Sequence, residues 1–285
     1  MKTLLIGKIH DQAEQLLREN TELQQTSAED FVKVKNFPEV EAVVLRTFTR
    51  LGKEELAKFQ KLKYVVSCSV GLDNLNLEEL KAEKIELIHC PGTNANSVAE
   101  HTVYLILSLL RRSRPVTELK NKTIGIIGFG YIGKLVAKKL AGFEAKIVAY
   151  DILEQDPKLL QQLNTEMKSF SAVLQEADIL TVHVPLNKNT GQLINKKALE
   201  KMKEDSYFIN TSRAEVIDEK ALIAAQHKFK GIALDVYSEK LKPQLKIANL
   251  ILTEHVAAQG EDSFEQMCLK PVQEFLKRIN ETMPI

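Results

Sequence analysis

A glycine-rich hexad, Gly128 to Gly133, constrains the fold of this chain more than any other feature of its sequence. It reads Gly-Phe-Gly-Tyr-Ile-Gly, follows an expected strand over 123–127 and leads into an expected helix over 132–142. An acidic residue, Asp151, ends the next expected strand, 18 residues beyond Gly133. A glycine hexad alone is weak evidence, but strand, hexad, helix and acidic residue together predict a dinucleotide-binding βαβ unit.

Each part of the hexad has a physical task in such a unit. Gly128 permits a tight turn, Gly130 lets the backbone approach a pyrophosphate, and Gly133 allows the helix to pack closely on the strand. Ile132, directly after Tyr131, begins the expected helix, whose unpaired N–H groups and partial positive charge attract phosphates. We therefore expect all five of these residues to bind the cofactor.

Asp151 indicates which dinucleotide is bound. Its carboxylate would accept hydrogen bonds from the adenosine ribose hydroxyls, and its charge would repel a 2′-phosphate, which favours NAD over NADP. The competing interpretation is that the glycines only form a turn and that Asp151 only starts a loop. The strand and helix around the hexad weigh against that interpretation.

The rest of the chain alternates short apolar runs with amphipathic segments. Several apolar runs are continuous in Val, Ile and Leu, as expected of strands that are covered on both faces. This alternation predicts an α/β fold with two doubly wound parallel sheets and right-handed crossovers. The expected strands are Thr3–Gly7, Ala42–Arg46, Tyr64–Ser67, Glu86–His89, Thr123–Ile127, Lys146–Tyr150, Ile179–His183, Tyr207–Asn210, Gly231–Leu234 and Leu250–Thr253. The expected helices include Asp11–Asn20, Lys53–Gln60, Leu77–Glu83, Ile132–Gly142 and Asp218–His227.

A domain boundary follows the longest apolar helix pattern, Ser97 to Arg112, which ends in a basic run before Pro115. Proline disfavours further helix there, and a new α/β unit opens soon after. No strand pattern follows His255, and a helix over about 262–280 remains. We therefore expect a Rossmann NAD-binding domain over 98–257, inserted in a flavodoxin-like substrate domain formed by 1–97 and 258–285.

Composition excludes several classes of protein. The 39 Lys and Arg against 38 Asp and Glu give a net charge of +1, and thus no reason to expect nucleic acid or a membrane as a partner. Cys68, Cys90 and Cys268 are widely spaced, which favours reduced thiols over a disulfide framework or a metal site. Without a signal-like or membrane-length apolar segment, we expect a cytoplasmic location.

Six further motifs occur in a fixed order along almost the whole chain. They are Ser-Val-Gly-Leu-Asp-Asn at 69–74, Asn-Ser-Val-Ala-Glu-His at 96–101, His-Val-Pro-Leu at 183–186, Asn-Thr-Ser-Arg at 210–213, Asp-Val-Tyr at 235–237 and Thr-Glu-His at 253–255. Together with the hexad, this order resembles the D-isomer-specific 2-hydroxyacid dehydrogenase family, which includes phosphoglycerate, glycerate and hydroxypyruvate enzymes. The combination is much more specific than any one motif.

The resemblance implies an NAD-dependent enzyme that interconverts a small D-2-hydroxy acid and its 2-keto acid in a cleft between two domains. Arg213 would hold the substrate carboxylate and carbonyl oxygen, since a guanidinium offers a rigid, always charged fork of donors. His255 would be the general acid in reduction and the general base in oxidation, because imidazole titrates near neutral pH. The N–H groups of Val70 and Gly71 would bind the carboxylate. Arg46 would bind a distal phosphate or carboxylate, or else be a surface arginine at a strand end.

On the cofactor side, the resemblance implies that Thr211 and Asp235 flank the nicotinamide. Val184 and Pro185 would line the adenine pocket. His183 begins the same loop, and we expect its side chain to pack at the end of a strand. The order of the motifs supports these assignments, since a single polar residue at a strand end usually has a structural role.

One position departs from the family pattern. Family members carry a glutamate five residues after the aspartate of the Asp-Val pair, where it hydrogen-bonds the catalytic histidine and supports its charged form. That position is Lys240 here, and Glu239 lies one residue earlier. Because the segment from Asp235 to His255 is shorter than in the family, we assign the role to Glu239. The alternatives are a lysine that impairs the proton relay, or two exposed loop charges.

A second departure concerns assembly. Relatives carry a longer segment, with a tryptophan, before the strand that precedes the hexad, and this segment contributes to their dimer interface. In the present chain that segment is only residues 113–122, and there is no Trp, so its sequence leaves a homodimer open. The two departures also leave a second possible function. In this alternative the protein binds and senses a dinucleotide with little turnover, and so resembles co-repressors of this fold. We expect the enzyme, because the chain has no basic tail and no peptide-binding appendage.

Overall fold

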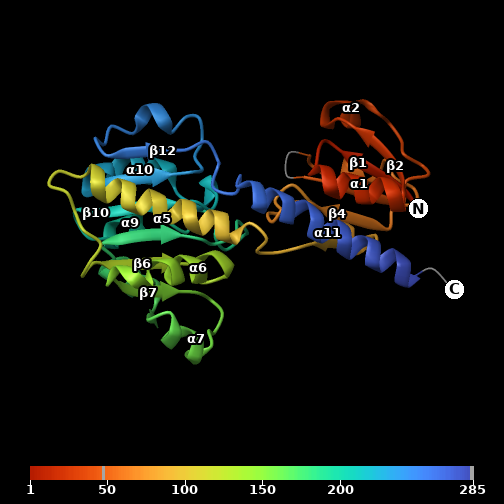
Figure 1. Cartoon of the computed structure of the whole chain (residues 1–285). Coiled ribbons are helices and arrows are strands. Elements are labelled where there is room, and N and C mark those ends of the chain that lie inside the picture. Colours follow the sequence, from red (N-terminus) through yellow and green to blue (C-terminus); the bar gives the residue numbers. More distant parts are fainter. Residues whose placement is uncertain (47–48, 283–285) are drawn as a thin grey trace. The chain divides into compact units, whose positions relative to one another are not determined.

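The computed structural model describes residues 1–46 and 49–282 and forms two compact units (Figure 1). Unit 1 comprises Met1–Asn94 and Gly260–Ile285, and unit 2 comprises Ala95–Gln259. Each unit is built around its own parallel sheet, as the alternation of apolar and amphipathic segments predicts.

The sheet of unit 2 has seven strands among the described residues, in the order β12-β11-β10-β9-β6-β7-β8, and all of its pairs are parallel. The chain builds outward from β6 in one direction and then in the other, so the strand order reverses between β6 and β9. This is the predicted doubly wound arrangement. The strands are β6 (Thr123–Ile127), β7 (Lys146–Tyr150), β8 (Thr165–Met167), β9 (Ile179–Val182), β10 (Ser206–Asn210), β11 (Phe229–Leu234) and β12 (Leu250–Leu252).

Helices bury both faces of this sheet in two separate hydrophobic cores. One core contains apolar residues of α5 and α6, and the other contains those of α8, α9 and α10. The helices are α5 (Ala95–Arg112), α6 (Tyr131–Leu140), α7 (Pro157–Gln162), α8 (Phe170–Glu176), α9 (Lys196–Lys201) and α10 (Glu219–Ala225). Short 3₁₀ turns are η1 (Ala141–Phe143), η2 (Ala214–Val216), η3 (Gln226–Lys228) and η4 (Lys242–Gln244).

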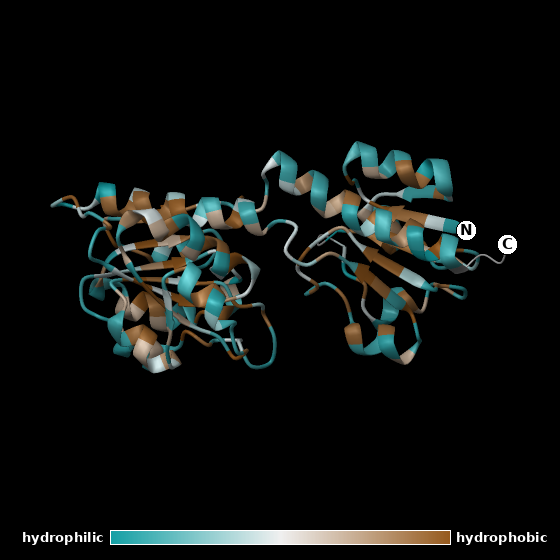
Figure 2. Cartoon of the chain, turned by 60° about the horizontal axis from the view of Figure 1, so that its bottom comes forward, coloured by the Kyte–Doolittle hydropathy of each residue, from teal (hydrophilic) through white to brown (hydrophobic). Residues whose placement is uncertain are grey.

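Unit 1 has a five-stranded parallel sheet in the order β2-β1-β3-β4-β5, which confirms the predicted flavodoxin-like domain. All residues of β3 and β4 are buried, as their continuous Val-rich sequences indicate. In Figure 2 the strands are mostly hydrophobic, and the helices that cover the sheets carry many hydrophilic residues. The strands are β1 (Lys2–Ile6), β2 (Glu22–Thr26), β3 (Ala42–Leu45), β4 (Tyr64–Ser67) and β5 (Glu86–His89).

The helices of unit 1 also divide between two cores. Residues of α1 and α11 contribute to one, and residues of α2, α3 and α4 contribute to the other. No helix in the described part of the chain is long and apolar enough to cross a membrane. The helices are α1 (Asp11–Asn20), α2 (Ala28–Lys33), α3 (Lys53–Leu56), α4 (Leu77–Ala82) and α11 (Glu261–Thr282).

The structure corrects the predicted elements at a few places. The strand β2 was not expected, because its sequence Glu-Leu-Gln-Gln-Thr is polar and it lies at the sheet edge. The three-residue strand β8 was also not expected. The helix expected to reach Gln60 ends at Leu56, since Phe59 instead forms a β-bridge with Phe37. The helix expected to reach His227 ends at Ala225 and continues as a 3₁₀ turn.

Candidate active site

The glycine hexad forms a loop between β6 and α6 that is tight on one side and open on the other. Gly128 has a φ of +94°, and a Cβ there would come within 2.7 Å of the backbone of His183. A Cβ on Gly133 would come within 2.2 Å of the carbonyl oxygen of Gly128. A Cβ on Gly130 would meet nothing within 4 Å. The loop therefore leaves room at Gly130, where α6 begins, for a ligand's phosphate groups.

Asp151 follows β7 and lies against this loop. Its Oδ2 accepts a hydrogen bond from the peptide N–H of Phe129 at 2.6 Å, and its Oδ1 accepts one from Leu153 at 2.9 Å. The next two side chains, Ile152 and Leu153, are apolar and are 86% and 68% exposed. The carboxylate fits the ribose hydroxyls of NAD. The two apolar residues that follow provide no positive charge for the 2′-phosphate of NADP. The residues present thus fit NAD.

The sequence-predicted cofactor residues of unit 2 meet at one edge of the sheet. Gly128, His183, Thr211 and Asp235 directly follow β6, β9, β10 and β11, which are neighbours in the sheet. Because all strands are parallel, these residues lie at their carboxyl ends. The strand order reverses between β6 and β9, and open α/β sheets bind ligands outside such a reversal. Tyr131 is exposed, Ile132 and Val184 are partly buried, and Pro185 is exposed.

His183 is buried and lies between two hydroxyl groups. Its Nε2 is 3.0 Å from Oγ1 of Thr181, and its Nδ1 is 3.4 Å from Oγ1 of Thr211. Burial lowers the pKa of the His183 imidazole to about 3, so the ring is neutral near pH 7. Both ring nitrogens have partners within unit 2, and the side chain joins the ends of β9 and β10.

Arg213 lies in a loop that Asn210 shapes. The amide oxygen of Asn210 accepts hydrogen bonds from the N–H and the hydroxyl of Ser212, at 3.0 and 2.7 Å. Its Nδ2 donates to the carbonyl oxygen of Arg213 at 2.9 Å. The guanidinium is partly buried, and its Nη1 donates to the carbonyl oxygen of Ser212 at 2.8 Å. The buried amide at the end of β10 therefore fixes the backbone from which Arg213 extends.

His255 lies in a turn that Asp235 holds in place. The N–H of His255 donates to the carbonyl oxygen of Asp235 at 2.9 Å. The Asp235 carboxylate accepts from the N–H groups of Val256 at 2.9 Å and Ala257 at 3.1 Å, and from the hydroxyl of Thr253 at 2.6 Å. His255 has a φ of 53°, which is left-handed and uncommon for a side chain of this size. Its side chain is exposed, whereas Asp235 is 1% exposed.

Glu239 and Lys240 are both exposed, in a turn after β11. Within residues 1–46 and 49–282, no hydrogen bond or ion pair joins either side chain to His255. The preceding residue, Ser238, donates its N–H and its hydroxyl to Glu219 at the start of α10. Glu219 could not be predicted, because nothing in the sequence links an acidic residue at a helix start to a distant turn.

The predicted substrate residues of unit 1 also lie at the carboxyl edge of their sheet. Arg46 directly follows β3, and Val70 and Gly71 follow β4. The strand order of unit 1 reverses between β1 and β3, so Arg46 stands at that reversal. Its guanidinium carbon is 4.7 Å from the ring centre of Phe264 in α11, a cation–π contact. Thr47, the residue after Arg46, lies outside the described residues.

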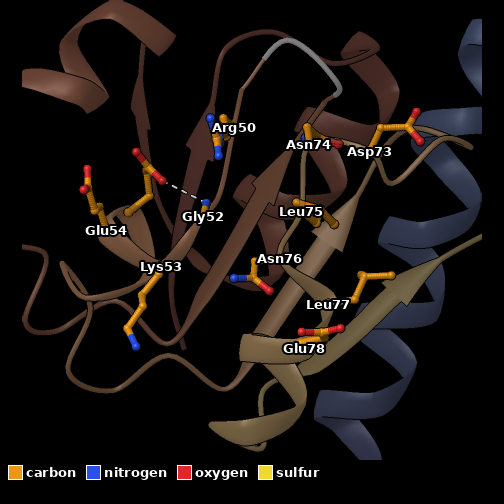
Figure 3. A pocket seen from close by; sticks show the side chains of 11 residues that line it. Arg50, Gly52, Lys53, Glu54, Asp73, Asn74, Leu75, Asn76, Leu77 and Glu78 are labelled. Carbon is orange, nitrogen blue, oxygen red and sulfur yellow. Dashed lines mark hydrogen bonds between the residues drawn. The ribbon is translucent and has the colours of Figure 1, made fainter. Parts of the chain in front are cut away.

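A separate pocket of about 730 Å³ lies next to these loops in unit 1 (Figure 3). Arg50 and residues 52–55 and 73–78 line it. Two basic side chains, Arg50 and Lys53, stand there among four acidic ones. Arg46, Val70 and Gly71 are not among the lining residues.

Comparisons with known proteins place the chain among characterised relatives. A family model described as "D-isomer specific 2-hydroxyacid dehydrogenase, NAD binding domain" matches residues 92–257. The chain is 30% identical to a hydroxypyruvate reductase of Thermotoga maritima, over 94% of this chain and 95% of that protein. It is 31% identical to a glyoxylate reductase of Thermofilum pendens, over 88% and 82%. A D-lactate dehydrogenase from Aquifex aeolicus, crystallised with NAD and lactic acid, has a TM-score of 0.87 at 26% identity and covers 98% of this chain and 96% of its own.

Proposed function

The chain belongs to the D-isomer specific 2-hydroxyacid dehydrogenase family, and we propose that it interconverts a small D-2-hydroxy acid and its 2-keto acid with His255 and Arg213 as the central residues. It is an NAD-dependent oxidoreductase by its family. The observation that supports the two assignments best is their place in the sheet. Arg213, Asp235 and His255 follow β10, β11 and β12, three neighbouring parallel strands, at one edge.

NAD binds unit 2 in this proposal. Its diphosphate lies at the hexad, its adenosine ribose at Asp151, its adenine at the loop after β9 and its nicotinamide near the ends of β10 and β11. When bound, reduced NAD supplies the hydride for the keto carbon. The proposed binding residues are Gly128, Gly130, Tyr131, Ile132, Gly133, Asp151, His183, Val184, Pro185, Thr211 and Asp235.

The chain's own residues bind the keto acid and supply its proton. Arg213 binds the carboxylate and draws electron density from the keto oxygen, because its planar guanidinium can donate two parallel hydrogen bonds. The N–H groups of Val70 and Gly71 bind the same carboxylate, and Arg46 binds an acidic group at the far end of a longer substrate.

His255 donates a proton to the keto oxygen during reduction and takes it back during oxidation. Its exposed side chain, on a turn fixed by Asp235, suits a group that must exchange protons with water. Glu239 hydrogen-bonds the imidazole in the reacting complex and supports its charged form.

The three cysteines are free, in keeping with a reducing cytoplasmic location.

The experiment that tests this function follows NADH absorbance with glyoxylate, hydroxypyruvate, pyruvate and phosphohydroxypyruvate as separate substrates. We expect at least one to be reduced to its D-hydroxy acid, with NADPH supporting a slower rate. A parallel titration measures NADH binding by fluorescence. Binding of NADH without its oxidation by any of these acids would contradict the enzyme and favour the dinucleotide sensor.

A further inference from the structure

His101, in α5, points toward the strand ends that carry Asp235 and His255. Its Nε2 is 3.2 Å from Oγ1 of Thr253 and 3.5 Å from Oδ1 of Asp235. The imidazole is 15% exposed, and the Asp235 carboxylate is fully buried. This contact links the helix α5 to the turn at the end of β12, and the function described above does not use it.

The hydrogen bonds around Asp235 determine where the His101 proton lies. Each oxygen of the Asp235 carboxylate accepts a peptide N–H, from Val256 at Oδ1 and from Ala257 at Oδ2. The hydroxyl of Thr253 donates its single proton to Oδ1 at 2.6 Å. Thr253 can therefore only accept from His101, so Nε2 of His101 carries a proton and acts as the donor.

The charge on His101 is consistent with this arrangement. Burial lowers the pKa of the His101 imidazole, and the nearby Asp235 carboxylate opposes this shift in part. The ring is therefore mostly neutral near pH 7, with its proton on Nε2 and a bare Nδ1. A neutral donor can hold the hydroxyl of Thr253 and the Asp235 carboxylate without adding a charge beside the cofactor site.

We propose that His101 is a positioning residue for His255: its Nε2–H orients Thr253 and Asp235, which in turn fix the left-handed turn that carries the acid–base imidazole. The inference rests on the proposed function of His255. That turn needs such support, because a left-handed φ of 53° costs free energy at any residue other than glycine and the side chain itself is exposed. Loss of the His101 donor loosens the turn and moves the His255 imidazole away from the keto oxygen. The hexad still binds NAD.

The test compares two substitutions at one position. His101→Gln retains an N–H donor near the place of Nε2, and His101→Leu removes it at similar size. Glu100→Gln serves as the control, because it alters the adjacent residue, whose carboxylate pairs with Lys139 at 3.0 Å. Thr253→Val, which removes only the hydroxyl, provides a second route if His101→Leu folds poorly.

Two measurements are made on each variant. Hydrogen–deuterium exchange is expected to be about tenfold faster at the amides of residues 255–257 in His101→Leu and Thr253→Val, as expected for loss of one buried hydrogen bond. The kcat for keto-acid reduction is expected to fall by roughly tenfold in the same variants, with the Kd for NADH unchanged. His101→Gln is expected to resemble the wild type in both measurements.

The outcomes separate this inference from the function on which it rests. If His101→Gln and His101→Leu are impaired alike, or if neither alters exchange at residues 255–257, His101 only fills space and the inference is wrong. If the wild-type protein reduces no keto acid, the proposed function fails, whereas the exchange measurement still shows whether His101 holds the turn.

Discussion

The carboxylate of Asp151 accepts a hydrogen bond from the peptide N–H of Phe129, the second residue of the glycine hexad, at 2.6 Å. This contact ties the end of β7 to the loop between β6 and α6. It means that one acidic side chain both shapes the phosphate-binding loop and stands where the ribose of NAD is expected. We therefore expect cofactor choice and loop conformation to depend on the same residue.

The first prediction concerns cofactor preference. Asp151→Ala removes the acceptor of the ribose hydroxyls and the charge that repels a 2′-phosphate. We expect the ratio of kcat/KM for NADH over NADPH to fall by roughly 10- to 100-fold, the range for hydrogen bonds to a charged group. Asp156→Asn, which alters the residue capping α7, is the control. An unchanged ratio in Asp151→Ala would refute the argument for NAD.

The second prediction concerns the substrate anchor. Arg213→Lys retains the positive charge but loses the planar pair of donors. We expect kcat/KM for the keto acid to fall by about 10- to 100-fold, with NADH binding unchanged. Arg18→Lys, an exposed change in α1, is the control. Equal activity of Arg213→Lys and wild type would show that Arg213 does not contact the substrate.

The third prediction decides between Glu239 and Lys240. Reduction needs a protonated His255, so its rate falls as pH rises. If Glu239 supports the charged imidazole, Glu239→Gln moves this fall to lower pH, because it removes a neighbouring negative charge. Lys240→Ala leaves the profile in place. A shift to higher pH in Lys240→Ala, with no effect of Glu239→Gln, would assign the position to the lysine.

The fourth prediction follows from the burial of His183. Its pKa of about 3 in the folded protein lies below the ordinary value of 6.5. Between these values the unfolded chain binds a proton that the folded protein excludes, so stability rises with pH and is lost as pH falls. From about pH 7.5 to about pH 5, the wild type should lose about 2 kcal/mol more than His183→Gln.

Urea unfolding at the two pH values measures this difference in the free energy of unfolding. His227→Gln is the matched control, because it makes the same substitution at an exposed histidine in a 3₁₀ turn. If the pH dependence of His183→Gln equals that of the wild type, the burial argument for His183 is wrong.

The sequence predicted the buried parts of the fold well. Continuous apolar runs such as 64–67 and 123–127 form strands with the expected bounds, because a strand covered on both faces has few alternatives to apolar residues. The strand β2 escaped prediction for the opposite reason. It lies at a sheet edge, where backbone hydrogen bonds hold it to β1. Its mostly polar side chains do not alternate with apolar ones, so the sequence shows no strand pattern there.

For the site, local motifs indicated which residues gather at the strand ends but not what they contact. The hexad and Asp151 lie together because they follow adjacent strands of a doubly wound sheet. The sequence did not predict that Asp235 directs its carboxylate at the turn of His255, or that His101 joins it. Such contacts link residues far apart in the chain, and their geometry depends on how α5 packs across the sheet.

The most direct test of the account is a single-turnover reduction of a keto acid by wild-type protein and by His255→Asn. Asparagine accepts the left-handed backbone that residue 255 adopts, so the variant removes the proton donor and keeps the turn. We predict that NADH binds both proteins equally and that NADH oxidation is slower in the variant by about 10²- to 10⁴-fold. Equal rates in the two proteins would show that His255 does not supply the proton.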